Sequence, residues 1–402
     1  MDRYKSFFRG IAYAGYCIVF LFAVYTFEKS IPDQIYVKAG EAIDYQFQVP
    51  VTMEIQEDSS PVAKSTNNAN VRQSYIVTCR LFGIFPVKDI EVVLVDGDAV
   101  YAGGMPIGIY VKTRGVLVIG TSEVERPDGS EAAPAENILK AGDYILSVNG
   151  EKVAEKEDLQ RLVQQNGAEK EILKINRKGE EVEVGVTPVQ NKNGTYMLGA
   201  WVRDDLAGIG TLTYYKEDGT YGALGHAVSD GDVGERIQMR EGYVYNAQII
   251  GVKKGQKGNP GELSGMIRYQ SADCLGTIEE NTDIGIYGKL DGNIAALPRG
   301  DYYNICYKQD IKQGPATIIC GFTGEKKEYA IEIESLDYSG DEENKGILFK
   351  VTDERLLDLT GGIVQGMSGS PIIQNGKMIG AVTHVFVSDA SMGYGIFIEK
   401  ML

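Results

Sequence analysis

Short runs in which apolar and polar residues alternate recur along most of the chain, a pattern typical of β-strands. Alternation over Gln34–Glu54, together with apolar runs at Tyr75–Phe85 and Ile90–Val95, predicts strands. The polar stretch 58–72 between them predicts an exposed linker. Residues 30–99 are therefore predicted to form a β-rich segment.

The pattern changes over residues 100–188, where strand-like runs surround one helical stretch. Lys156–Gln165 places Leu159, Leu162 and Val163 on one face of a predicted helix. The string LKAGDYILSVNGEKV, which begins at Leu139, resembles the matching string of PDZ domains. Within it, Asn149-Gly150 predicts a tight turn between two strands. This resemblance implies a PDZ domain over residues 100–188.

A PDZ domain binds a peptide as an added strand between an edge strand and a helix. We expect the edge strand near the start of the segment and the helix at its centre. The alternative is a PDZ fold that serves only as a spacer, with an empty groove. The residues expected to line the groove are Gly108, Ile109, Tyr110, Val111, Leu159 and Val163.

Residues 196–402 contain many short apolar runs separated by glycines. Short strands with turn residues between them predict a barrel or a sandwich rather than a parallel α/β sheet. The length of the region suits a pair of β-barrels. One helix is predicted to interrupt the strands at Asp353–Leu359.

The N-terminus carries an uncharged apolar run, Gly10–Phe27, preceded by Arg3, Lys5 and Arg9. Such a run with a basic flank predicts a membrane-spanning helix whose N-terminus is cytoplasmic. A cleavable signal peptide is the alternative, but no small-residue cleavage site follows the run. We therefore expect residues 1–29 to anchor the chain, with the remainder outside the cytoplasm.

Composition narrows the function without defining it. The 402 residues are 43% hydrophobic and 24% charged, as expected of a globular protein. A net charge of −16 argues against nucleic acid as a partner, because phosphate binding needs a basic surface. Five scattered cysteines and two histidines do not form the spacing of a zinc site, and no cofactor is expected. Cys306 and Cys320 could pair, although free buried thiols are the simpler interpretation.

The candidate chemistry lies in the hexapeptide GMSGSP, which begins at Gly366. A serine between glycines in this setting is typical of the nucleophile of a β-barrel serine protease. Glycines permit a tight turn that projects the hydroxyl of Ser368 and turns nearby N–H groups toward a reacting carbonyl oxygen. We predict Ser368 as the nucleophile, and the backbone N–H groups of Gly366 and Ser368 as the oxyanion hole. The predicted fold is thus mainly β: a PDZ domain followed by a chymotrypsin-like double β-barrel serine peptidase domain, with an N-terminal transmembrane helix.

A serine nucleophile needs a base, and histidine is the usual one at neutral pH. His226 lies in a loop of small residues, GALGHAV, whereas His384 lies in a strand shortly after Ser368. We favour His226, because base and nucleophile usually come from opposite walls of the cleft. The residues alone do not choose the supporting acid. The candidates between His226 and Ser368 include Asp230, Asp232, Asp283 and Asp353.

Four strings together resemble the stage IV sporulation protein B peptidases of endospore-forming bacteria. They begin at Trp201 (WVRDDLAGIGT), Gly222 (GALGHAV), Thr360 (TGGIVQGMSGSP) and Gly380 (GAVTHVF). The resemblance covers nearly the whole chain, from anchor through PDZ domain to peptidase. It implies His226 as base, Ser368 as nucleophile and Asp353 as supporting acid.

The resemblance also implies a signalling protease that enters the space between the two forespore membranes. Such an enzyme cuts itself and a membrane-bound regulator, which triggers processing of a sigma factor during endospore formation, and its PDZ domain regulates it. Two other interpretations of the sequence stay open. One is a catalytically silent PDZ scaffold at the envelope. The other is an envelope stress protease, although those enzymes place the PDZ domain after the protease.

Overall fold

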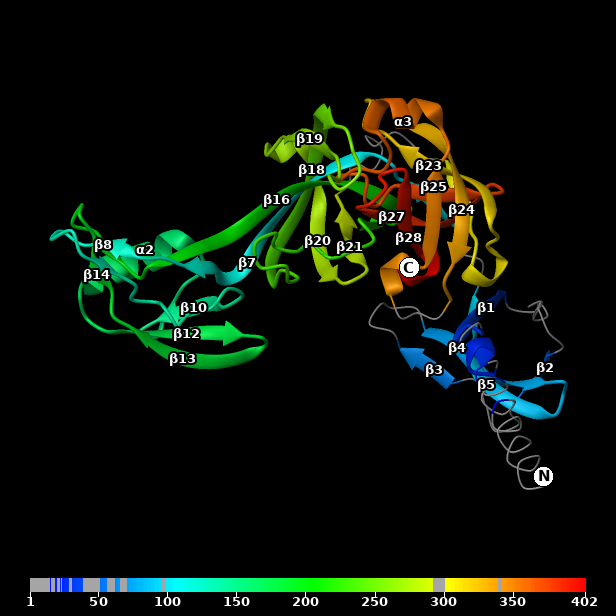
Figure 1. Ribbon diagram of the computed structural model, residues 1–402, viewed down its shortest axis with the longest axis horizontal. Helices are drawn as coiled ribbons and strands as arrows, with labels where there is room; N and C mark the ends of the chain where they lie inside the picture. Colours follow the sequence, from blue (N-terminus) through cyan, green and yellow to red (C-terminus); the bar gives the residue numbers. More distant parts are fainter. Residues whose placement is uncertain are drawn as a thin grey trace, which may run out of the picture.

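The computed structural model describes residues 15, 19, 22, 24–28, 31–38, 51–55, 62–65, 71–95, 99–291, 301–338 and 342–402. These residues form a mainly β protein, as predicted, and it has three regions. A β-sheet near the N-terminus adjoins a large β-region, and a separate lobe extends from the opposite side on two long strands (Figure 1).

The N-terminal region is a five-stranded sheet in the order β1-β5-β4-β2, with β3 added alongside β4. β1 runs parallel to β5. The core of this sheet includes Ile35, Val77 and Ile90. The predicted linker is wrong in part, because residues 62–65 form a strand that pairs with β4. The strands are β1 (Gln34–Lys38), β2 (Val51–Ile55), β3 (Val62–Ser65), β4 (Val71–Leu81) and β5 (Phe85–Val95).

The extended lobe contains the predicted PDZ elements. The helix α2 (Lys156–Asn166) buries Leu159, Leu162 and Val163 against the lobe's core, as its apolar spacing predicted. Asn149 and Gly150 both have positive φ, which suits the two-residue turn predicted between β10 and β11. The other strands of the lobe are β8 (Val124–Glu125), β9 (Glu131–Ala132), β10 (Tyr144–Val148), β11 (Glu151–Lys152), β12 (Glu171–Arg177), β13 (Glu180–Val186), β14 (Val189–Gln190) and β15 (Tyr196–Met197).

An ion pair inside the lobe connects the loop before β10 to strand β12. The Asp143 carboxylate is 1% exposed and accepts two hydrogen bonds of 2.7 Å from the Arg177 guanidinium on β12. Arg177 also donates to the Ile138 carbonyl oxygen. A buried carboxylate is tolerated only with such partners, so this pair fixes how the loop before β10 sits on the sheet.

The large β-region has three apolar cores. One is built mainly from β7, β16, β17, β18, β20 and β21, and the second from β23 to β28. The third lies around β6, β22 and the C-terminal strands and also includes Val93 and Val95 of β5. Its single α-helix among the described residues, α3 (Glu354–Thr360), lies where the sequence predicted one. The elements are β6 (Ala99–Ala102), β7 (Pro106–Thr121), β16 (Ala200–Tyr215), β17 (Thr220–Ala223), β18 (Met239–Lys253), β19 (Glu262–Ile267), η1 (Ser271–Asp273), β20 (Cys274–Thr282), β21 (Gly285–Leu290), β22 (Tyr302–Ile305), η3 (Lys308–Asp310), β23 (Gly314–Cys320), β24 (Lys327–Leu336), η4 (Glu343–Lys345), β25 (Ile347–Val351), β26 (Pro371–Gln374), β27 (Lys377–Val385), β28 (Met392–Phe397) and η5 (Ile398–Lys400).

Two long antiparallel strands, β7 and β16, join the lobe to the large β-region (Figure 1). Their pairing runs from Thr121 opposite Ala200 to Pro106 opposite Thr211. β7 also pairs with β10 in the lobe and with β18 in the large region. Residues 106–113, predicted to open the PDZ domain, therefore belong to the large β-region. The lobe is inserted between two strands that remain partners.

Most of the predicted anchor, Gly10–Phe27, lies outside the described residues. Within the part of the chain that is described, no helix has the length and apolarity needed to cross a membrane. Four cysteines fall in that part, and all are free thiols, so Cys306 and Cys320 do not pair.

Candidate active site

A cleft of ≈ 610 Å³ brings together the residues predicted from distant parts of the sequence. Ser368, Gly366 and both histidines line it. One wall comes from β7, β16 and the loop after β17, and the other from residues 363–368 and β27. The remaining lining is largely apolar and includes Ile109, Leu206, Ile209, Val228, Pro260, Ile363, Val364, Val385 and Val387.

The turn that carries Ser368 is held in shape by its neighbours. Met367 is 1% exposed and packs in the second core, and this pulls the backbone inward on one side of the serine. Gly369 has φ of +95, and a Cβ there would lie 2.1 Å from the Thr211 carbonyl oxygen. Only glycine fits that close approach, so the Ser368 side chain is left facing the cleft.

Two N–H groups of this turn are free to bind an oxygen. The amides of Gln365, Met367 and Gly369 donate to the carbonyl oxygens of Gly261, Val364 and Val382. Among the described residues, the amides of Gly366 and Ser368 donate to none. Alternate amides of one turn are thus unpaired, which is the arrangement expected of an oxyanion hole.

Strand β16 supports the turn from the opposite wall. The Thr211 amide donates to the Ser368 carbonyl oxygen at 3.0 Å, and the Thr211 hydroxyl donates to the Gly366 carbonyl oxygen at 2.9 Å. These bonds hold the peptide units 366–367 and 368–369, which directly adjoin the units that carry the free N–H groups of Gly366 and Ser368. Sequence reasoning picked out the β16 string only through a family resemblance and missed this supporting role.

His226 is oriented by the backbone. It follows Leu224 and Gly225, which have φ of 73 and 76, and these conformations turn the chain into the cleft. Its Nδ1 lies 2.8 Å from the Ala227 carbonyl oxygen. Because a carbonyl oxygen only accepts, Nδ1 carries the proton and Nε2 keeps its lone pair. Burial lowers the pKa of His226 below its ordinary 6.5, although the bond to Ala227 works in the other direction. The ring is therefore neutral at neutral pH.

His384 lies beside His226, with their ring centroids 5.5 Å apart. Burial is the main reason that the pKa of His384 is lowered to about 4, and the nearby His226 lowers it further. Its Nδ1 is buried and has no hydrogen-bond partner among the residues described. His384 therefore shares the cleft as a neutral ring, but no contact fixes its tautomer.

The Ser368 hydroxyl donates to the Thr383 carbonyl oxygen at 3.0 Å and not to either imidazole. The hydroxyl is thus held in a resting orientation on the second wall of the cleft. A rotation about the Cα–Cβ bond changes this partner without moving the turn.

The structure does not bring Asp353 to His226. Asp353 caps the N-terminus of α3, accepting from the Arg355 amide at 3.0 Å and from the Ala330 amide at 3.2 Å. The Arg355 side chain, with these amides, lowers the pKa of Asp353 to about 2. Asp353 does not line the cleft. The direct contact implied by the resemblance is therefore not formed, because the carboxylate is already saturated at the helix end.

The other candidate acids have partners elsewhere as well. Asp230 is 1% exposed and pairs with Arg203, which also contacts Asp232. Asp283 is paired with Arg236 at the surface. Among the described residues, His226 makes no hydrogen bond or ion pair with a carboxylate. The backbone carbonyl of Ala227 occupies the position that an acid holds in a Ser-His-Asp triad.

The peptide groove predicted at Gly108–Val111 is also corrected. These residues pair with β16 on one side and with β18 on the other, so they offer no free edge. Ile109 lines the cleft of Ser368 instead. Leu159 and Val163 are 5% and 3% exposed within the core of the lobe. The prediction failed because the strand is longer than its local pattern showed, and only its second half enters the lobe.

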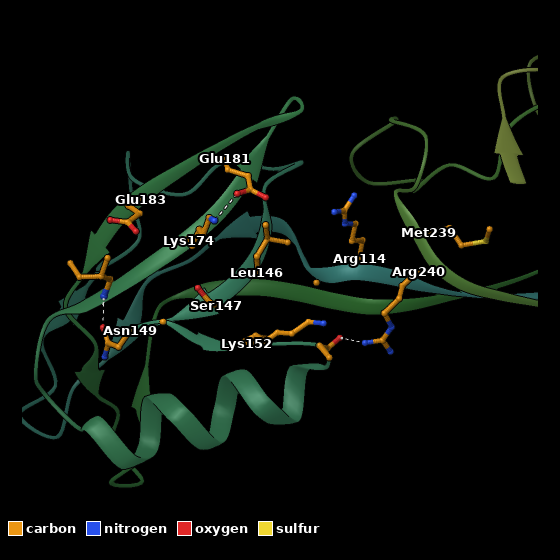
Figure 2. Close-up of a pocket in the computed structure, with 15 residues that line it drawn as sticks. Arg114, Leu146, Ser147, Asn149, Lys152, Lys174, Glu181, Glu183, Met239 and Arg240 are labelled. Carbon is orange, nitrogen blue, oxygen red and sulfur yellow. Dashed lines mark hydrogen bonds and ion pairs between the residues drawn. The ribbon is translucent and has the colours of Figure 1, made fainter. Parts of the chain in front are cut away.

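A larger hollow of ≈ 1100 Å³ lies between the lobe and the start of β18. Figure 2 shows Lys174, Ser147 and Lys152 on the lobe's side of it, and Met239 and Arg240 on the other. It contains neither histidine nor Ser368. Size alone therefore does not locate the chemistry, and the smaller cleft is the better candidate because it holds a nucleophile, a base and free amides.

The fold and the cleft define a peptidase with a PDZ lobe, and comparison with known proteins agrees. Residues 194–402 match the family described as SpoIVB peptidase S55, and residues 127–177 match the PDZ domain family. The first match spans more than half of the chain, which therefore belongs to the SpoIVB peptidase S55 family.

A solved structure similar to part of the chain is the crystal structure of the Rv3671c protease from M. tuberculosis in its active form. The two are 16% identical, with a TM-score of 0.28, over 49% of this chain and 73% of the other. No curated protein matches the sequence.

Proposed function

We propose that this peptidase is a serine endopeptidase in which Ser368 is the nucleophile and His226 the general base. The observation that carries the proposal is the cleft in which Ser368, His226 and two free amides meet. The two apolar cores that flank the cleft support the predicted pair of β-barrels.

The reaction begins when substrate enters and the Ser368 hydroxyl rotates from the Thr383 carbonyl toward His226. Nε2 takes the hydroxyl proton as Oγ attacks the scissile carbonyl carbon. The oxyanion then accepts hydrogen bonds from the amides of Gly366 and Ser368. The imidazolium returns its proton to the leaving amine, and water hydrolyses the acyl-enzyme by the same steps.

The Ala227 carbonyl holds the His226 tautomer during these steps. It accepts from Nδ1–H in the resting enzyme and stabilises the imidazolium as it forms, although more weakly than a carboxylate would. Asp353 acts at a distance, since α3 is followed directly by the segment that carries Ser368.

At the level of the cell, the proposed enzyme is anchored in a membrane, with its N-terminus cytoplasmic and its bulk outside the cytoplasm. It cleaves itself and a membrane-bound regulator, and so triggers sigma-factor processing during endospore formation. Family membership and the apolar run at Gly10–Phe27 support this role. The partners are protein substrates and the membrane.

A fluorophosphonate probe tests the chemistry. We expect the wild type to be labelled and Ser368→Ala to lose labelling entirely. Ser229→Ala is the matched control, because Ser229 lines the same cleft but has no role in the proposed reaction. Labelling that survives Ser368→Ala, or none in a folded wild type, would contradict the proposal. The second of these outcomes would favour the silent PDZ scaffold.

Self-cleavage needs a separate measurement. The chain from Ser30 onward is expressed as wild type and as Ser368→Ala, and the N-termini of the products are sequenced. Trimming confined to the wild type supports self-cleavage and identifies the site. Identical N-termini in both would rule it out for this form.

A further inference from the structure

The lobe has a strand edge where a PDZ domain receives its peptide, and the chain's own β16 lies on it. Val116 and Leu117 of β7 pair with Ile145 and Tyr144 of β10 on one side. On the other side Thr121, Gly120, Val118 and Leu117 pair antiparallel with Ala200, Trp201, Val202 and Arg203. The main-chain groups that a peptide would use are therefore taken by residues 200–203.

Helix α2 closes the other side of the same groove. It lies against β15 and the start of β16. Ala200 and Val202 pack on the core that includes Leu159 and Val163, whereas Trp201 points away and is 64% exposed. An aliphatic residue at every second position, between a strand and a helix, is how a peptide is bound by strand addition.

Asp204, the last residue of this segment, places a carboxylate at a helix N-terminus, where the C-terminal carboxylate of a bound peptide would lie. The Asp204 carboxylate, 8% exposed, accepts from the Lys156 amide at 3.0 Å at the N-terminus of α2. It also pairs with the Lys156 ammonium at 3.1 Å. A carboxylate at a helix N-terminus is favourable because the first N–H groups are unpaired.

We infer that residues Ala200–Asp204 are an intramolecular ligand that closes the PDZ groove, and that an outside peptide enters only by displacing them. The peptide this groove fits is extended, has small aliphatic side chains at alternate positions, and ends in a free carboxylate that replaces the Asp204 carboxylate. This corrects the position of the predicted groove along β7 and adds that it is occupied.

Displacement would be felt in the catalytic cleft, an extension that rests on the proposed function. The same strand β16 continues from Val202 to Thr211, whose amide and hydroxyl hold the Ser368 turn. Gly208 and Ile209 between them line the cleft. When a peptide displaces the first residues of β16, part of the β7–β16 pairing is lost, and the position of Thr211 becomes less fixed. We therefore expect peptide binding to slow the reaction of Ser368.

The chain contains its own reporter, because Trp201 is its only tryptophan. We would use the full chain carrying Ser368→Ala, so that peptide binding is measured without cleavage. The probe is a fluorescein-labelled peptide with the sequence of residues 196–204 carrying Trp201→Phe, and a scrambled peptide is the control. Peptide anisotropy and Trp201 emission are followed together.

Opening the groove should strengthen peptide binding. A groove that is closed about 99% of the time weakens apparent affinity about 100-fold. Val202→Asp disfavours the closed state, and we expect it to bind the peptide at least about 10-fold more tightly than the parent chain. Equal affinity of the two chains would overturn the inference.

If Val202→Asp unfolds the lobe, a disulfide between β7 and β16 provides a second test, because this lock can be formed by oxidation and opened by reduction. Val118 and Val202 are direct partners, so V118C/V202C can form a disulfide across the two strands. We expect the oxidised chain to lose peptide binding and the reduced chain to regain it. Unchanged binding after oxidation would show that the peptide does not use this groove.

The coupling is tested with Ser368 restored. Saturating peptide should slow fluorophosphonate labelling about threefold or more, and the oxidised lock should remove that effect. Labelling that is unchanged or faster with bound peptide would overturn the coupling alone. No labelling in any form would instead contradict the proposed function, while the binding experiments in Ser368→Ala would still decide the groove.

Discussion

The catalytic cleft and the PDZ groove are both bordered by β16, but they differ in how their backbone groups are satisfied. In the cleft, the amides of Gly366 and Ser368 have no partner among the described residues. In the groove, the edge of β7 is paired by residues 200–203. A substrate can therefore enter the first site directly, whereas a ligand of the second must compete with the chain.

The difference follows from the cost of each arrangement. An exposed, unpaired strand edge invites pairing with other chains, and covering it with β16 removes that risk. Two free amides at a solvent-accessible turn cost little, because water can satisfy them until a substrate arrives. The free donors therefore fit the proposed oxyanion hole, and the covered edge fits the proposed displacement of residues 200–203 by a peptide.

The largest expected effect separates the two histidines of the cleft. His226→Ala should lower the labelling rate of Ser368 about 10³-fold or more, because it removes the base whose tautomer Ala227 fixes. His384→Ala should lower it less than about 10-fold, since no contact fixes that ring's tautomer. The reverse ranking would assign the base to His384.

The next largest effect concerns Thr211, the residue of β16 that holds the Ser368 turn. Thr211→Val removes the hydroxyl bond to the Gly366 carbonyl and keeps the shape of the side chain. We expect labelling to slow by roughly 10-fold, in line with one lost hydrogen bond of about 1 kcal/mol and a less ordered oxyanion turn. Binding of the residue 196–204 peptide should not change. A parallel change in both readouts would mean that the variant disturbs β16 as a whole.

A smaller effect tests the role of Asp353. Asp353→Ala should slow labelling a few-fold and cost about 1 kcal/mol of stability, because the α3 cap is lost. Asp353→Asn should restore most of the rate, since asparagine caps as well as aspartate. If Asp353 instead held His226, the asparagine variant would lose about 10⁴-fold. The measurements are the labelling rate and the thermal midpoint of each variant.

The last prediction is a pH dependence confined to the cleft. His226 acts when neutral, so the labelling rate should be full above its pKa and fall as pH drops through a value below 6.5. A further loss is expected near pH 4, where His384 gains a charge beside it. His384→Asn should remove only the second step. Peptide binding to V202D at pH 6 and pH 7 should be equal, because neither histidine lies in the groove.

Much of the fold was predictable because it depends on local patterns. The apolar spacing of Leu159, Leu162 and Val163 predicted α2, and Asn149-Gly150 predicted the tight turn. The hexapeptide around Ser368 was predictable for the same reason, since its glycines serve a local turn. The partners of Asp353 were not, because the Ala330 amide that it binds comes from a distant strand.

The sequence by itself determined the mainly β class, the PDZ elements, and the candidate pair of Ser368 with one of two histidines. Only the tertiary structure decided that β7 and β16 stay paired through the insertion of the lobe. That pairing places Ile109 in the cleft, Val202 in the groove and Thr211 against the Ser368 turn. The physical reason is that a strand's side chains follow from its own residues, whereas its hydrogen-bond partners are set by whichever edge the folded chain brings to it.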